Sequence, residues 1–477
     1  MTEPFDVFAA AREVPDRIAL VEPGRSWSYA ELALLSGQAL AWLRARGVSR
    51  AGDATPAAVA VLAHPTPHQI AMTFALMAAG VPCLPVHPRL TEPERTALVV
   101  HAQASLYVDT AWQHEPAAST SQPAFPSRSG ASEAPLALVQ TSGTTAGPRL
   151  ALLSERAFRS SAAAHAAHLG WTRTDRWLLA LPFAHIGGLS ILTRCLAARS
   201  TVALPVFASG AGAGGSAAQV AGSLEPLGVS LLSMVPTQLE QLLELSGWRT
   251  PSSLRAVLVG GAAANEATLT RARARGLPVL PTYGMTETCS QICTRAVAPE
   301  SAEAGVGRPL SGVELAIVDG EIHVRGATLF SGYWGDPEQY TPSTWFPTGD
   351  LGSVDDHGCL HVLGRLADRI ISGGENVNPL EVERVLGPCV APRRLCIFGR
   401  EDSLWGEQVA LAIEGPADPA LIERVTQTAQ DRLAGFKRPR LVAFVERLPE
   451  LAPGKVQRRA LVESRSLPLI RMAYTRG

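Results

Sequence analysis

The sequence is short of the features that mark several classes of protein. Its 7 cysteines are scattered and form no Cys-x-x-Cys pair. This spacing indicates neither a zinc site nor a disulfide framework, and such thiols are expected to stay reduced in a cytosol. The formal net charge is -1, so neither nucleic acid nor an anionic membrane is expected as a partner.

Membrane and export signals are also missing. The first six residues are acidic and lack the pattern of a signal peptide. The longest apolar region, residues 59–86, is interrupted by histidines and prolines. We interpret it as a strand, a helix and a strand (58–63, 68–79 and 81–85) and not as a membrane span. The expected location is the cytoplasm.

The features that are present predict a large α/β protein. A chain of 477 residues exceeds the size at which one core stops growing, so more than one domain is expected. Residues 154–257 alternate between helical and strand patterns, which indicates βαβ units around mostly parallel sheets. Short strands over 307–356 predict a small antiparallel β module. A small, mobile α+β domain is expected to follow, so we predict two domains, 1–364 and 365–477.

A glycine- and hydroxyl-rich stretch, residues 140–149, follows a short apolar strand at 136–139. Backbone N–H groups and Ser/Thr hydroxyls in such a loop can surround an anion, and Arg149 adds a charge suited to phosphate. The loop is not a Walker A sequence, since Gly143 is not followed by Gly-Lys-Ser/Thr at the required spacing. By itself the stretch is more typical of a surface turn.

Further motifs follow in a fixed order along the chain: Thr282-Tyr-Gly-Met-Thr-Glu-Thr288, Thr348-Gly-Asp-Leu-Gly352, Gly364-Arg-Leu-Ala-Asp368, Ser372-Gly-Gly-Glu-Asn-Val377 and Pro453-Gly-Lys-Val-Gln-Arg458. Together with the loop they resemble the adenylate-forming superfamily of acyl-CoA synthetases, luciferases and peptide-synthetase adenylation domains. The resemblance implies a two-step reaction. A carboxylate attacks the α-phosphate of MgATP and releases pyrophosphate, and the thiol of coenzyme A then displaces AMP.

The resemblance also implies roles for individual residues. Glu287 is the expected Mg²⁺ ligand, because Mg²⁺ typically takes one or two carboxylates together with phosphates. Lys455 would bridge the acid and the α-phosphate during adenylation. The remaining expected residues are Thr141, Ser142, Gly143, Thr144, Thr145, Gly147 and Arg149 for phosphate, Gly261, Tyr283, Gly284 and Thr286 for adenine and α-phosphate, Asp350 and Arg365 for ribose, His185, Gly187, Gly260 and Ser290 for the acid, Gly373, Gly374 and Glu375 for CoA, and Ala367 with Asp368 for the interdomain hinge.

Two segments depart from the superfamily pattern. In the loop, Ala146 and Leu150 replace frequent glycines, and Gly147 and Arg149 stand where lysines are common. We therefore expect a stiffer loop and weaker ATP binding. At the hinge, Ala367 occupies the position that is often Asp or Lys.

The acid is indicated by residues 181–190 and by 286–291, which look most like the o-succinylbenzoate–CoA ligases of menaquinone biosynthesis. Arg194 lies on the apolar helix after His185, where a charge is unexpected. It either pairs with an internal carboxylate or binds the second carboxylate of the substrate. Another aryl- or acyl-CoA ligase (benzoate, anthranilate or fatty acid) and an inactive nucleotide-binding paralogue remain as alternatives, and a homodimer is compatible with the sequence.

Overall fold

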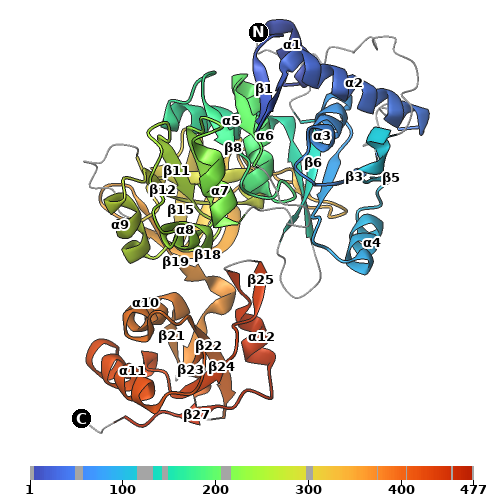
Figure 1. Cartoon of the computed structure of the whole chain (residues 1–477). Helices are drawn as coiled ribbons and strands as arrows, with labels where there is room; N and C mark the ends of the chain where they lie inside the picture. The colour runs from blue at the N-terminus through green and yellow to red at the C-terminus, as the bar shows by residue number, and fades with distance from the viewer. Residues whose placement is uncertain are drawn as a thin grey trace. The chain divides into compact units, whose positions relative to one another are not determined.

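The computed structural model of the chain describes residues 5–48, 57–114, 133–141, 149–205, 216–296, 305–372, 374–403, 405–452 and 455–474, with the backbone alone at 451, 452 and 455. It divides into two compact units (Figure 1). Unit 1 comprises Met1–Glu314 and Arg325–Phe346, and unit 2 comprises Leu315–Val324 and Pro347–Gly477. The domain boundary predicted after Gly364 stays a prediction.

Unit 1 contains a nine-stranded sheet. In spatial order its strands are β14 (Arg308–Pro309), β13 (Ser290–Thr294), β12 (Val279–Met285), β11 (Ala256–Val259), β10 (Leu231–Met234), β8 (Arg176–Leu178), β9 (Thr201–Ala203), β1 (Ile18–Glu22) and β2 (Arg25–Ser28). The strands from β12 to β1 are parallel, and antiparallel strands complete both edges. The helices that alternate with these strands are α5 (Glu155–Leu169), α6 (Ile186–Ala198), α7 (Ala217–Leu224), α8 (Pro236–Leu243) and α9 (Glu266–Ala274). The predicted βαβ alternation is confirmed.

A second sheet of unit 1 contains the strand before the glycine-rich loop. Its order is β17 (Gly332–Tyr333), β7 (Arg149–Ser154), β6 (Pro135–Thr141), β4 (Cys83–Val86), β3 (Val59–Leu62) and β5 (Leu106–Val108). The associated helices are α1 (Val7–Glu13), α2 (Tyr29–Ala45), α3 (Pro67–Ala79) and α4 (Glu92–His101). Region 59–86 thus forms the predicted strand, helix and strand. In the part of the chain that the structure describes, no helix is long and apolar enough to cross a membrane.

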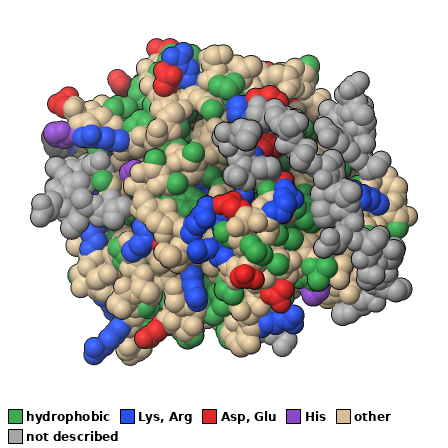
Figure 2. Space-filling model, turned by 90° about the horizontal axis from the view of Figure 1, so that it is seen from above, with side chains coloured by type: hydrophobic (Ala, Val, Ile, Leu, Met, Phe, Trp, Pro, Cys, Tyr) green, Lys and Arg blue, Asp and Glu red, His purple; other side chains and the backbone are tan. Residues whose placement is uncertain are grey.

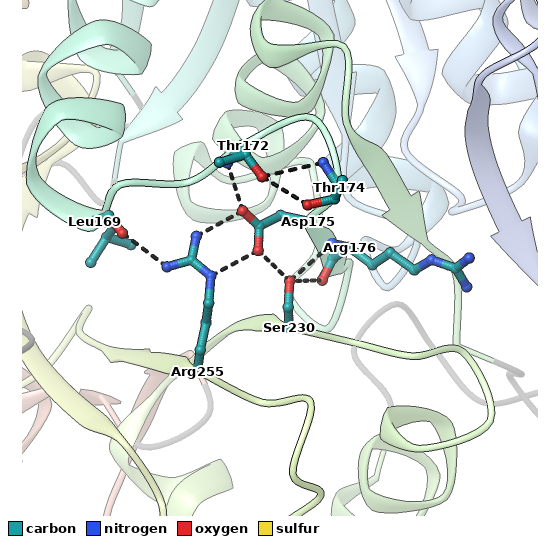
Figure 3. A network of polar contacts seen from close by, with 7 residues as sticks. All are labelled: Leu169, Thr172, Thr174, Asp175, Arg176, Ser230 and Arg255. Carbon is teal, nitrogen blue, oxygen red and sulfur yellow. Dashed lines mark hydrogen bonds and ion pairs between the residues drawn. The ribbon is translucent and has the colours of Figure 1, made fainter.

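A partly buried polar network holds the amino ends of three parallel strands together (Figure 3). Asp175, just before β8, accepts hydrogen bonds from Arg255 Nε and Nη2 at 2.8 and 2.7 Å, and from the Ser230 hydroxyl at 2.6 Å. Arg255 precedes β11 and also donates to the carbonyl of Leu169 at the end of α5. These bonds lie at the amino ends of the strands, so the opposite, carboxyl ends remain available for the site.

Unit 2 contains the β module and the α+β fold. The module is a four-stranded sheet in the order β15 (Val313–Val318), β16 (Glu321–Gly326), β18 (Phe346–Val354) and β19 (Leu360–Arg365). A second sheet has the order β21 (Glu375–Val377), β20 (Ile370–Ser372), β23 (Gly406–Glu414), β24 (Leu441–Val445) and β27 (Ile470–Arg471), with β22 (Leu395–Asp402) on β23. The helices are α10 (Pro379–Val390), α11 (Pro419–Arg432) and α12 (Arg458–Glu463), and β25 (Glu450–Ala452) pairs with β26 (Lys455–Val456).

The charged residues are mixed in sign and strongly biased in type. On the face in Figure 2, Lys and Arg side chains lie among Asp and Glu side chains, as the near-zero net charge predicts. Of 42 basic residues only two, Lys437 and Lys455, are lysines. The Lys437 ammonium lies 2.6 Å from Glu381 on α10. None of the seven cysteines, all of which lie in the described residues, forms a disulfide bond.

Candidate functional site

Several predicted site residues of unit 1 lie at one edge of the nine-stranded sheet. Gly260 and Gly261 directly follow β11, Thr286 directly follows β12, and His185 lies in the segment between β8 and α6. These parallel strands run in the same direction, so the segments after them meet at the carboxyl edge, where α/β sheets commonly bind ligands. Gly261 has φ +80°, a conformation that favours glycine and keeps the backbone open to a ligand.

The turn between β12 and β13 is strained and tightly held. It contains the short 3₁₀ segment Thr286–Thr288, followed by Cys289 and Ser290 with φ of 53° and 90°. The Thr288 hydroxyl lies 3.0 Å from the Met285 N–H and 2.9 Å from the Ser290 carbonyl. A Cβ on Gly284 would lie 2.0 Å from the carbonyl oxygen of Ser290, so any side chain at position 284 would clash with it. Positive φ in two non-glycine residues is costly, and such strain clusters at functional sites.

Glu287, the expected metal ligand, contacts a residue that the sequence analysis did not identify. The hydroxyl of Tyr333 donates to Glu287 Oε1 at 2.9 Å. The Arg149 guanidinium lies 3.3 Å from the centre of the Tyr333 ring and 3.2 Å from Asp336. Antiparallel pairing of β17 with β7 causes this arrangement, because it sets Tyr333 opposite Ala151. Glu287 and Arg149 are thus joined through Tyr333.

The remaining loop residues can be placed only in part. Thr141 is buried at the end of β6, and its hydroxyl lies 3.4 Å from the Arg149 carbonyl. Ser142, Gly143, Thr144, Thr145 and Gly147 lie outside the described residues. Tyr283 and Gly284 are at the end of β12, half-buried beside the Glu287 turn.

The residues around Glu287 fit a Mg²⁺ ion bound together with a polyphosphate. Within the described ranges there is no group of three or more His, Cys, Asp or Glu side chains suited to a metal. Mg²⁺ does not require such a cage, since it commonly binds one or two carboxylates, substrate phosphates and waters. Glu287 can supply one carboxylate, and the Tyr333 hydroxyl holds one of its oxygens in place.

His185, at the start of α6, lies next to a second histidine, His87. The ring centres of His185 and His87 are 5.4 Å apart. Burial, then the charges of His185 and Arg89, lower the pKa of His87 to about 4. His87 follows β4 of the other sheet, and no sequence motif pointed to it. Two residues after His185, Gly187 approaches the Leu181 side chain so closely that a Cβ on Gly187 would lie 3.1 Å from it.

Arg194 is buried on α6, and among the described residues it has no counter-ion. Its side chain is 1% exposed, and Nη2 donates to the Ser161 hydroxyl at 3.1 Å. Its Nε and Nη1 atoms are buried and have no hydrogen-bond partner. No carboxylate of the described residues pairs with Arg194. The structure therefore does not show the internal ion pair that was one of the two alternatives for this residue. Burial lowers the pKa of Arg194 to about 10, which still leaves it charged at neutral pH.

Ser290, the last of the expected acid-binding residues, is also buried and close to α6. Its hydroxyl donates to the Gln291 side chain at 2.7 Å and lies 3.4 Å from the hydroxyl of Ser190. The Ser290 turn and α6 are therefore in direct contact.

In unit 2 the two expected ribose residues are partners. Asp350 on β18 stands opposite Arg365 on β19, and Arg365 Nε lies 2.7 Å from the Asp350 carboxylate. The side chain of Asp350 is buried, whereas about half of the Arg365 side chain is exposed. The pair therefore offers a buried carboxylate with a half-exposed cation beside it.

The hinge and CoA residues also belong to unit 2. Ala367 and Asp368 form a 3₁₀ turn (Leu366–Asp368), and Asp368 lies 2.5 Å from Arg458. Gly374 has φ +83° in the turn before β21, and Glu375 on that strand is exposed, whereas Gly373 lies outside the described residues. Lys455 begins β26 opposite Ala452, with only its backbone described.

Comparison with protein families gives two matches. The model of the AMP-binding enzyme family matches residues 7–334, and that of the AMP-binding enzyme C-terminal domain matches residues 381–455. The chain is 36% identical over 338 residues to the 2-succinylbenzoate–CoA ligase of Listeria innocua, covering 69% of this chain and 70% of that protein. It is 32% identical over 494 residues to the indoleacetate–CoA ligase of Aromatoleum aromaticum, covering 93% and 94%.

Two solved structures of o-succinylbenzoate CoA synthetase from Bacillus subtilis are similar throughout. One is a complex with the acyl-adenylate intermediate OSB-AMP, with a TM-score of 0.85, 31% identity, and coverage of 97% of this chain and 98% of that one. The other is a complex with ATP and a magnesium ion, with a TM-score of 0.84, 31% identity, and coverage of 96% and 99%.

Proposed function

The chain belongs to the AMP-binding enzyme family, and we propose that it is an ATP-dependent acid–CoA ligase acting on 2-succinylbenzoate. In the first step a carboxylate oxygen of the acid bonds to the α-phosphorus of ATP, and pyrophosphate leaves. In the second step the CoA sulfur bonds to the acyl carbon, the thiol proton is lost, and AMP leaves. Both steps are dominated by phosphate charge, so catalysis depends on positioning and charge neutralisation.

The observation that favours this acid is the uncompensated charge of Arg194. An isolated buried charge costs several kcal/mol, so proteins usually pair it. A substrate with two carboxylates supplies the pair, since one is activated and the other stays ionised. Gly187 and Arg194 are seven positions apart, or about 10 Å along α6, a distance suited to an acid that extends along the helix.

Residues of unit 1 would bind the nucleotide end of the substrates. Glu287 would hold Mg²⁺, and the ion would neutralise phosphate charge. Arg149 would contact phosphate oxygens next to that ion, and Tyr283 would lie against the adenine. His185, Gly187, Gly260 and Ser290 would border the acid.

Residues of unit 2 would complete the reaction. Asp350 and Arg365 would bind the ribose, and Lys455 would stabilise charge on the α-phosphate during adenylation. Gly374 and Glu375 would border the CoA path during thioester formation. We expect the enzyme to be located in the cytoplasm. The proposed function is compatible with a homodimer.

A pyrophosphate-release assay with a panel of acids tests the proposal. Wild-type protein with MgATP should turn over 2-succinylbenzoate with a higher kcat/KM than benzoate, indoleacetate or a fatty acid. Arg194→Ala should lower kcat/KM for 2-succinylbenzoate by about 100- to 1,000-fold and leave the KM for ATP nearly unchanged. A folded wild type that prefers a monocarboxylic acid overturns the assignment of the acid.

The second candidate is a ligase for an aryl monocarboxylic acid. The full-length similarity to indoleacetate–CoA ligase supports it. In that case indoleacetate would be the better substrate, and Arg194→Ala would affect stability more than selectivity. Release of pyrophosphate with none of the acids would instead favour the inactive paralogue.

A further inference from the structure

Three buried side chains around one tryptophan ring have hydrogen-bonding nitrogens without partners. Arg194 lies 5.7 Å above the ring of Trp177, His165 stacks on that ring at 5.4 Å, and Trp171 meets it edge-on at 6.0 Å. The unpartnered atoms are Arg194 Nε and Nη1, both ring nitrogens of His165, and Trp171 Nε1. We refer to Arg194, His165 and Trp171 as the donor cluster.

The helices bring this cluster together. Ser161 and His165 are four residues apart on α5, so they share the face that packs against α6. Ser161 accepts from Arg194 and donates 2.8 Å to the carbonyl of Cys289, in the turn that follows Glu287. Gly170 ends α5 with φ +57°, and the next residue, Trp171, packs its ring 6.4 Å from that of His165.

The cluster offers hydrogen-bond donors and very little to accept them. His165 is 0% exposed, and burial together with the nearby Arg194 charge keeps its pKa well below the ordinary value. His165 is therefore neutral, with one N–H, while Trp171 and Arg194 can only donate. Buried polar groups are almost always hydrogen-bonded, so several such donors around one cation call for an anionic acceptor.

We infer that His165 and Trp171 act with Arg194 as binding residues for the carboxylate of the substrate that is not activated. The inference rests on the proposed function and deepens it, because it assigns two residues that select a dicarboxylic acid. A carboxylate has two oxygens with about four acceptor sites, enough for Arg194 Nε and Nη1, one N–H of His165 and the indole N–H of Trp171. Trp177 is not a member, because its own indole N–H already donates to Ser233 at 3.2 Å.

The test compares two acids that differ by one carboxylate. 2-Succinylbenzoate is measured against 3-benzoylpropionate, which keeps the ring and the chain but lacks the ring carboxylate. For each variant the ratio of kcat/KM for the diacid to that for the monoacid is determined by pyrophosphate release. The variants are His165→Phe, His165→Gln, which keeps a neutral N–H, and Trp171→Phe, which keeps an aromatic ring.

We expect His165→Phe and Trp171→Phe each to lower the ratio about tenfold, the size of one hydrogen bond to a charged group, with the monoacid nearly unchanged. His165→Gln should keep most of the ratio. Trp112→Phe is the matched control, because this buried indole already donates to Gln69 at 2.7 Å, far from the cluster in sequence. It should lower the melting temperature and leave the ratio unchanged.

The outcomes separate the two claims. If wild type shows no preference for the diacid, the proposed substrate is wrong, and the inference that rests on it is wrong as well. If wild type prefers the diacid and Arg194→Ala removes the preference, but His165→Phe and Trp171→Phe retain it, the inference is wrong and the proposed function stands. Should His165→Phe fail to fold, Trp171→Phe and His165→Gln still decide the question.

Discussion

The hydroxyl of Tyr333 donates a hydrogen bond of 2.9 Å to Oε1 of Glu287. The two residues are 46 positions apart in sequence. The ring of Tyr333 also lies beneath the Arg149 guanidinium, so one side chain orients both a carboxylate and a cation. Groups that hydrogen-bond to a metal ligand commonly matter nearly as much as the ligand itself.

We therefore predict that Tyr333→Phe weakens the use of Mg²⁺. The substitution keeps the ring under Arg149 and removes only the hydroxyl that holds Glu287. The Mg²⁺ concentration for half-maximal pyrophosphate release should rise about 10-fold, within the range for loss of such a partner. Tyr340→Phe is the control, since Tyr340 stacks on Phe330 in the same region. An unchanged Mg²⁺ titration for Tyr333→Phe would count against Glu287 as the ligand.

Lys455 should act in adenylation alone. Lys455→Ala is expected to reduce acid-dependent pyrophosphate release by about 100- to 1,000-fold, the scale for one preorganised charge-stabilising group. Thioester formation from chemically prepared acyl-adenylate and CoA should remain nearly intact. A comparable loss in both half-reactions would contradict the assigned role.

The 3₁₀ turn at Ala367 should be the pivot between the two half-reactions. Ala367→Pro fixes φ near -65° and restricts Leu366, so one arrangement of the turn should be favoured. One half-reaction should then fall far more than the other. Ala391→Ser serves as a substitution control elsewhere in unit 2. Equal loss in both halves after Ala367→Pro would place the pivot at another residue.

The Asp175–Arg255 pair should stabilise unit 1 in a pH-dependent way. Burial opposes ionisation of Asp175, but hydrogen bonds from Arg255, Ser230 and Thr172 outweigh it and hold the pKa of the carboxyl below its usual value. A lowered folded pKa means that the stabilisation is complete above the unfolded value, near 3.8, and is lost as pH falls through the folded value. Asp175→Asn should thus cost roughly 3 kcal/mol at neutral pH, with the difference shrinking below about pH 4.

Urea unfolding at several pH values measures this effect. The exposed pair of Glu244 and Arg271 provides the control, because Glu244→Gln should change stability by less than about 1 kcal/mol. A difference between wild type and Asp175→Asn that stays constant down to pH 2 would show that the carboxylate charge is not the source of the stabilisation.

Local sequence signals predicted the elements of the fold well. Ser28 and Glu31 have the three-residue spacing of a capping box in the sequence, and they form one at the start of α2, with bonds of 3.2 and 2.7 Å. Element ends were less accurate: strands were expected over 58–63 and 81–85, but β3 covers Val59–Leu62 and β4 covers Cys83–Val86. The distribution of strands over two sheets of unit 1 was not predictable, because strand pairing depends on contacts between residues far apart in sequence.

The candidate site was predictable where a motif is continuous in sequence. Thr286 and Glu287 are adjacent and belong to one such motif. Tyr333, His87 and His165 come from other segments, and each resembles an ordinary core or surface residue when considered alone. Their relation to Glu287, His185 and Arg194 follows from strand register and helix packing. The roles assigned to all of these residues remain predictions that the experiments above address.

The ion pair between Lys437 and Glu381 has a practical consequence. The chain has two lysines, so acylating reagents selective for amines can modify only two ε-amino groups besides the α-amino group. One of these, the ammonium of Lys437, forms an ion pair of 2.6 Å with Glu381 on α10. Peptide mass spectrometry can assign the label to each lysine separately. Labelling of Lys455 in the presence and absence of ATP and acid, with Lys437 as an internal standard, would follow its environment through the reaction without any substitution.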